Sequence, residues 1–210
     1  MFMTNDIFLS PHFKLSEFVV SETASRHGID NTPPEEAVEN LRRLCQGTLE
    51  PLREALQLPV VITSGFRTKA LNDRLAHSSE RSQHMQGCAA DFYVSCAAEP
   101  RFKAAEPRFN GPLAQFKVQG SKVQGSLTKV RATQGSMTKV QGRRELLIKA
   151  FRLIITSPEI DYDQLILYPN FIHVSYVSKE RNRHNILKAR SNGKLGYGKL
   201  SYANAILLNY

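Results

Sequence analysis

Two histidines and one aspartate in this sequence offer the ligands of a hydrolytic zinc site. His84 and Asp91 lie within the string Ser82-Gln83-His84-Met85-Gln86-Gly87-Cys88-Ala89-Ala90-Asp91, and His173 lies far downstream in Phe171-Ile172-His173-Val174-Ser175. A hydrolytic zinc site takes three protein ligands from His, Asp, Glu or Cys and keeps a fourth position for water. The combination therefore predicts one zinc site, although a single histidine considered alone is by default an ordinary surface or core residue.

Asp91 and His173 both lie in segments where apolar residues alternate with other residues, as they do in half-buried strands. The alternating apolar residues are Ala90, Phe92 and Val94 around Asp91, and Ile172, Val174 and Tyr176 around His173. Successive side chains of a strand point to opposite faces, so each strand would bury its apolar set and present its ligand on the other face. Two such strands could direct both ligands to one point.

The string Ser82–Asp91 resembles the signature Ser-x-His-x-x-Gly-x-Ala-x-Asp of the zinc D-Ala-D-Ala carboxypeptidase family, an M15-like group that includes D,D-dipeptidases and phage endolysins. The five fixed positions all match, at Ser82, His84, Gly87, Ala89 and Asp91. Further similarity lies at Phe13–Phe18, Ser64–Thr68 and Asp163–Ile166. The resemblance implies a peptidase of the D,D-carboxypeptidase or endopeptidase type that cleaves peptidoglycan stem peptides. It also implies that His84, Asp91 and His173 bind Zn²⁺ and that Arg67 is catalytic.

Arg67, Ser82, Gln83 and Tyr168 are the candidate substrate-binding residues. Arg67 follows the apolar run Pro59–Thr63, which predicts a buried strand that ends beside the site. A guanidinium there can bind a peptide carboxylate through two hydrogen bonds or stabilise an oxyanion. The alternative is a surface arginine with a local salt bridge. Ser82 is better suited to orienting its loop than to nucleophilic attack, because no base is visible at triad spacing.

A general base is missing from the positions where relatives place it, a few residues before the last histidine. Asn170 lies three residues before His173, and Tyr168 stands where a strand-end Glu would fall. An amide does not titrate and a phenol titrates near about 10, so neither is a good base at neutral pH. Asp161 and Asp163, further upstream, are interpreted as a solvated turn. The alternative function is therefore a degenerate homologue that binds zinc and peptide but does not cut.

The net charge of +9 over 210 residues comes from two segments. Residues 96–144 hold ten basic and two acidic residues, and residues 179–210 hold seven basic and one acidic, which leaves the rest of the chain at about −5. The first segment consists of short repeats with too little apolar surface to offset chain entropy, which predicts a disordered low-complexity insertion. The second is interpreted as a basic C-terminal tail. Charge confined to such segments argues against a nucleic-acid partner.

The remaining patterns predict a single α+β domain over residues 1–210, with a small, mostly antiparallel sheet flanked by helices. One helix is expected after a capping box at Thr32–Glu35, and another from Leu146 to Ser157. Three cysteines without Cys-x-x-Cys spacing indicate a reducing compartment. The first residues predict no signal peptide, and no apolar stretch approaches the length of about 20 residues that a membrane span needs. We expect a monomer in the bacterial cytoplasm that binds no membrane and reaches the wall by a phage-type release or by another export route.

Overall fold

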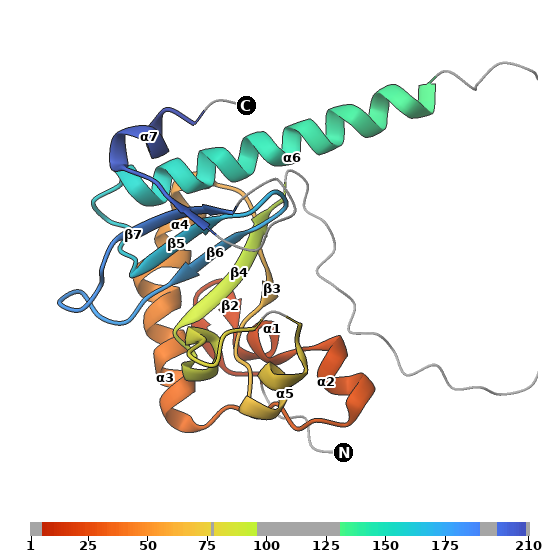
Figure 1. Cartoon of the computed structure of the whole chain (residues 1–210), viewed down its shortest axis with the longest axis vertical. Coiled ribbons are helices and arrows are strands. Elements are labelled where there is room, and N and C mark those ends of the chain that lie inside the picture. Colours follow the sequence, from red (N-terminus) through yellow and green to blue (C-terminus); the bar gives the residue numbers. More distant parts are fainter. Residues whose placement is uncertain (1–5, 77, 96–130, 190–196, 209–210) are drawn as a thin grey trace, which may run out of the picture.

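A mixed six-stranded sheet is the centre of the structure, a computed structural model that describes residues 6–76, 78–95, 131–189 and 197–208. In spatial order its strands are β3 (Val60–Ser64), β4 (Ala89–Val94), β6 (Ile172–Ser175), β5 (Gln164–Leu167), β7 (Asn185–Ala189) and β8 (Tyr197–Lys199). Neighbouring strands are antiparallel except for the parallel pair β5 and β7. The predicted α+β class with a mostly antiparallel sheet is confirmed (Figure 1).

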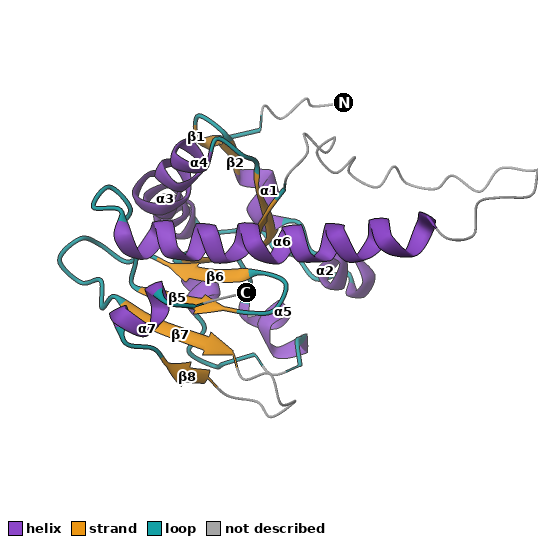
Figure 2. Ribbon diagram, turned by 90° about the horizontal axis from the view of Figure 1, so that it is seen from above, coloured by secondary structure: helices purple, strands orange, loops and turns teal. Residues whose placement is uncertain are grey.

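Helices cover the face of this sheet that carries the apolar residues. They are α3 (Glu35–Leu44), the π-helical turn η1 (Cys45–Leu49), α4 (Glu50–Leu56), α6 (Arg131–Thr156) and α7 (Tyr202–Ile206). The helix α6 runs across the sheet (Figure 2), and its apolar side chains pack with those of α4 and the strands in one core. Phe92 and Phe151 are fully buried there. No helix among the described ranges is long and apolar enough to cross a membrane.

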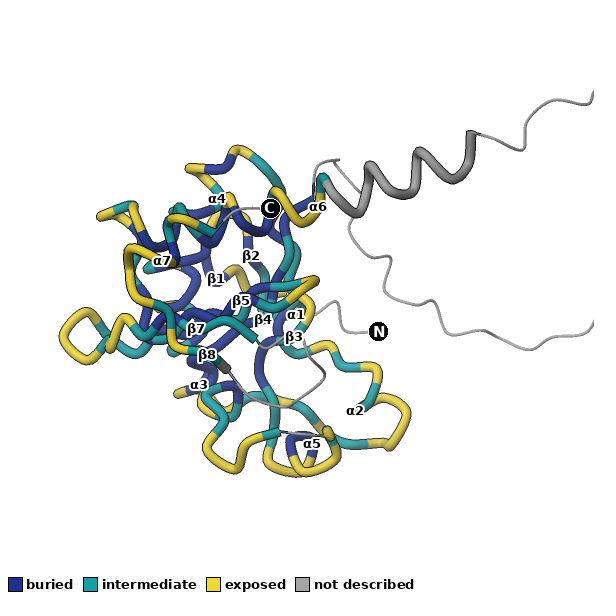
Figure 3. The backbone as a smooth tube through the Cα atoms, turned by 45° about the horizontal axis from the view of Figure 1, so that its top comes forward, coloured by how far each residue is buried: buried dark blue, intermediate teal, exposed yellow. Residues whose placement is uncertain are grey.

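Smaller elements lie around the last residues of β3 and the first residues of β4. They are β1 (Phe8–Ser10), β2 (Phe13–Lys14), α1 (Leu15–Val19), α2 (Glu22–His27), α5 (Lys69–Arg74) and the 3₁₀ turn η2 (Gln83–Gln86). Exposed residues are frequent in the loops around α2 and α5 and in other surface loops, whereas the strands β4, β5 and β6 are largely buried (Figure 3). Cys45 and Cys88 are buried free thiols, and Cys96 lies outside the described residues.

The predicted capping box at Thr32–Glu35 does not form. Helix α3 begins at Glu35 with Pro34 as its N-cap residue, and no side chain caps it. The hydroxyl of Thr32 instead donates to Asp30 Oδ1 at 2.6 Å. The carboxylate of Asp30 therefore binds the Thr32 hydroxyl, which the sequence pattern had predicted to cap the helix.

Two segments that were defined by their composition contribute regular structure. Helix α6 begins at Arg131, well before Leu146, so it includes the last part of the predicted insertion, while residues 96–130 lie outside the described residues. The segment 179–210, predicted to be a basic C-terminal tail, contains β7, β8 and α7. Ile186 and Ala205 are buried. A short strand that carries few apolar residues gives a weak periodic signal, so composition alone does not indicate such a strand.

Candidate metal centre

Asp91 and His173 lie directly opposite each other on neighbouring strands. Asp91 is the third residue of β4, His173 is the second residue of β6, and the antiparallel register pairs the two. Residues paired across two strands share one face of the sheet. Asp91 Oδ1 and His173 Nδ1 are consequently 2.8 Å apart, on the face opposite the helix-covered core.

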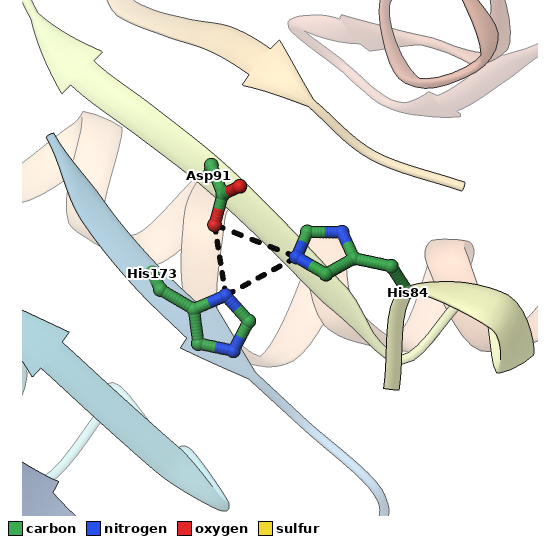
Figure 4. Close-up of side chains that lie close together, drawn as sticks. All are labelled: His84, Asp91 and His173. Carbon is green, nitrogen blue, oxygen red and sulfur yellow. Dashed lines mark hydrogen bonds and ion pairs between the residues drawn. The ribbon is translucent and has the colours of Figure 1, made fainter. Parts of the chain in front are cut away.

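His84 reaches the same point from the turn η2. The turn ends at Gly87, whose φ of +70° is in the left-handed region that favours glycine. A Cβ at this position would also lie 2.3 Å from the carbonyl oxygen of Ala37, so α3 and the turn can approach this closely only at a glycine. His84 Nε2 lies 3.2 Å from His173 Nδ1 and 3.5 Å from Asp91 Oδ1 (Figure 4).

The three ligand atoms fit a zinc ion. Zinc–nitrogen and zinc–oxygen bonds of about 2.0–2.1 Å at a tetrahedral angle place ligand atoms about 3.3 Å apart. The observed separations of 2.8, 3.2 and 3.5 Å bracket this value. His84 Nδ1 donates to the carbonyl oxygen of Gly65 at 2.6 Å, which turns the lone pair of Nε2 toward the other two ligands. The donor set leaves a fourth coordination position, as a hydrolytic site requires.

The charges around the site favour the protonation states that a metal needs. Burial alone would raise the pKa of Asp91, but the adjacent imidazoles of His84 and His173 outweigh burial and hold this pKa well below its usual range. Burial lowers the pKa of His84, although Asp91 acts in the opposite direction. A carboxylate beside a neutral imidazole is the combination that binds a metal without first losing a proton.

Arg67 lies at the edge of this centre, and its guanidinium is only partly hydrogen-bonded. Its Nη2 donates weakly to Ser82 Oγ at 3.4 Å, and its buried Nε has no hydrogen-bond partner among the described residues. Burial lowers the pKa of Arg67, while nearby Asp91 and Tyr168 act against that shift. A guanidinium carries several N–H donors, so Arg67 is suited to bind an anionic group of a ligand.

The loop that carries Arg67 is held by Asn31, which the sequence did not single out. The side-chain amide of Asn31 donates to the carbonyl oxygens of Val19 and Phe66 at 2.9 and 3.1 Å and accepts from the backbone of Thr68 at 2.9 Å. A Cβ at Gly65 would lie 2.5 Å from the backbone oxygen of Phe18, so this loop also packs too closely for a side chain there. No local pattern around Asn31 could have indicated these long-range contacts.

Of the other candidate substrate-binding residues, Ser82 and Tyr168 lie near Arg67, whereas Gln83 contacts Asp163. Ser82 contacts Arg67, and Tyr168 stacks on Phe171 with the ring centroids 4.2 Å apart. Tyr168 also interacts electrostatically with Arg67, so these residues lie together beside the candidate metal ligands. The side-chain amide of Gln83, in contrast, donates to Asp163 Oδ2 at 2.8 Å.

The interpretation of Asp161 and Asp163 as a solvated turn is wrong. The side chain of Asp163 is 1% exposed and forms a two-point ion pair with Arg183, at 2.7 and 2.6 Å. Asp161 accepts hydrogen bonds from Asn182 and His184 at 2.8 and 2.7 Å. The loop before β7 brings these partners back beside β5, because the two strands pair in parallel. That pairing depends on residues about 20 positions away, which the local pattern does not contain.

Residues 11–108 of the chain match the family model described as Peptidase M15. The matched segment includes Arg67, His84 and Asp91 and ends before His173. The match supports a relationship with M15-like peptidases, and with it the hydrolase and metallopeptidase classes. Searches of the curated proteins and of the solved structures found no match.

Proposed function

We propose that this protein is a zinc-dependent peptidase that cleaves peptidoglycan stem peptides, of the D,D-carboxypeptidase or endopeptidase type. The observation that carries the proposal is the convergence of three candidate ligand atoms within 4.8 Å of one another beside the partly hydrogen-bonded guanidinium of Arg67. The match of residues 11–108 to a peptidase family supports the same conclusion. Because peptidoglycan is extracellular, the proposal includes a phage-type route of release.

The residues divide the chemistry between them. Bound zinc supplies a Lewis acid that polarises a carbonyl oxygen and lowers the pKa of a bound water to about 7. His84 and His173 offer ring nitrogens and Asp91 a carboxylate oxygen for its coordination. Arg67 offers hydrogen-bond donors to a substrate carboxylate or to the oxyanion that develops during attack. Tyr168 and Phe171 form a stacked aromatic pair that can pack against the substrate beside Arg67.

The second candidate function is a degenerate homologue that binds zinc and peptide without cleaving the peptide. It is favoured by one specific observation, since a phenol rather than a carboxylate lies at position 168 beside Arg67. A phenol is a weaker base than a carboxylate for this role, because it is largely protonated at neutral pH in water. Zinc affinity and peptide affinity would both be retained in such a protein, and only turnover would be lost.

The deciding experiment is hydrolysis of purified peptidoglycan by the zinc-loaded protein, with release of amino groups as the readout. The controls are a chelator-treated sample, His173→Ala, and the matched variant His184→Ala, which removes a histidine that binds Asp161 away from the ligand cluster. Release that is lost with chelator and with His173→Ala but retained with His184→Ala supports the peptidase. A protein that binds one zinc and releases nothing supports the degenerate homologue.

A further inference from the structure

Asp163 is a buried carboxylate that contacts the turn bearing His84 without belonging to the ligand cluster. Its side chain accepts from Gln83 Nε2 at 2.8 Å, from Arg183 Nε and Nη2 at 2.7 and 2.6 Å, and from Ser175 Oγ at 3.4 Å. The backbone amide of Arg183 also donates to it, at 3.0 Å. One carboxylate therefore joins the turn η2, strand β6 and the loop before β7.

The position of Gln83 makes this contact relevant to the metal centre. Gln83 is the first residue of η2 and immediately precedes His84. Its carbonyl oxygen accepts from the backbone amide of Cys88 at 3.0 Å, which ties the start of the turn to the residue before β4. The side-chain contact with Asp163 fastens the same residue to the start of β5. His84 is therefore held by Gly65 at its Nδ1 and by Asp163 through the preceding residue.

The ion pair with Arg183 explains how the carboxylate can remain charged at this position. A buried charge without a partner costs several kcal/mol, and a two-point contact with a guanidinium compensates it. The side chain of Arg183 is 59% exposed, so its contribution is charge compensation rather than packing. An ionised Asp163 accepts hydrogen bonds only, which suits the amide donor of Gln83.

We propose that Asp163 is a positioning residue for the metal ligand His84, acting through Gln83, with Arg183 compensating its charge. The inference rests on the proposed function only in that the cluster binds zinc. Partners that orient a metal ligand from outside the coordination sphere contribute to affinity, and their loss typically weakens metal binding about 10–100-fold. The same loss is expected when the contact between Gln83 and Asp163 is removed from either side.

The test measures zinc affinity by competition with a chromophoric chelator, together with the visible spectrum of the Co²⁺-loaded protein. Asp163→Asn and Gln83→Met should each weaken zinc binding about 10–100-fold and alter the Co²⁺ spectrum. The double variant should bind zinc little more weakly than the single variant with the larger loss of affinity, because both changes break the same contact. Asp161→Asn is the matched control, since Asp161 holds the same loop through Asn182 and His184. Its zinc affinity should stay within about twofold of the parent protein.

Two results would overturn the proposal. One is an unchanged zinc affinity and Co²⁺ spectrum in Gln83→Met, which keeps the buried ion pair intact and therefore decides the matter if Asp163→Asn does not fold. The other is an equal loss in Asp161→Asn and Asp163→Asn, which would indicate general loosening of the loop. A parent protein that binds zinc but cleaves no peptidoglycan would refute the proposed function and leave this inference standing.

Discussion

Replacing Gly87 with alanine tests whether the turn that delivers His84 depends on a close approach to α3. The residue has a φ of +70°, where a side chain costs about 1–2 kcal/mol. The added Cβ would also lie 2.3 Å from the carbonyl oxygen of Ala37, an overlap of the kind that costs about 1–3 kcal/mol in a packed interior. Together these effects should lower the free energy of unfolding by about 2–5 kcal/mol.

Gly28 offers a matched control, because it has nearly the same φ of +61° but no heavy atom of the described chain within 4 Å of an added Cβ. Gly28→Ala should therefore cost only the backbone component, about 1–2 kcal/mol. Urea titrations give both free energies, and the thermal midpoint should fall by about 2–4 °C for each kcal/mol. Zinc affinity should fall in Gly87→Ala and stay unchanged in Gly28→Ala. Equal destabilisation by the two substitutions would refute the argument from the Ala37 contact.

Four further predictions concern the site itself. Zinc at about 1,000 times its dissociation constant should stabilise the fold by about 4 kcal/mol, and His173→Ala or chelator should abolish the zinc-dependent rise in thermal midpoint. Arg67→Met should lower peptidoglycan turnover about 10²–10³-fold while zinc stoichiometry stays at one, and an unchanged rate would exclude the proposed anion contact. Tyr168→Glu should increase turnover by about 10²–10⁴-fold, whereas Tyr168→Phe should not; equal rates would show that no base is needed at this position. Burial would raise the pKa of Asp163, but Arg183 and Gln83 hold it below its ordinary 3.8. This carboxylate therefore stabilises the fold at neutral pH, and that stability is lost as the pH falls below about 4. Urea titrations from pH 7 to pH 3 should show a shallower acid loss for Asp163→Asn.

The strand geometry of the site could be predicted from local sequence. The alternation around Asp91 and His173 indicated which face of each strand would be buried, and the observed burial of Ala90, Phe92, Ile172 and Val174 agrees. Period-two alternation is a property of one strand, so it is visible in a single segment. The two strands are direct neighbours with Asp91 opposite His173, but this pairing depends on the whole sheet and is not visible in either segment alone. Only the resemblance to a zinc family linked them.

Long-range polar contacts could not be predicted from the sequence. Asp163 was interpreted as solvated because its immediate neighbours give no sign of Arg183, which approaches only after a loop and a parallel strand pairing. Asn31 holds the loop of Arg67 from a separate part of the chain, and nothing around it distinguishes it from an ordinary loop asparagine. Hydrogen bonds of this kind leave no periodic trace, whereas apolar burial does.

The pairing of Asp91 with His173 determines where the chain tolerates insertions and deletions. Adding or deleting one residue between Ala89 and Asp91 would rotate the aspartate to the helix-covered face, because side chains alternate along a strand. The same change just beyond Val94 falls after the paired residues and leaves the ligand register untouched. The long repetitive stretch 96–130 lies on this permissive side, between the end of β4 and the start of α6. Insertions and deletions are therefore tolerated after Val94, whereas three residues earlier, at Asp91, the strand register excludes them.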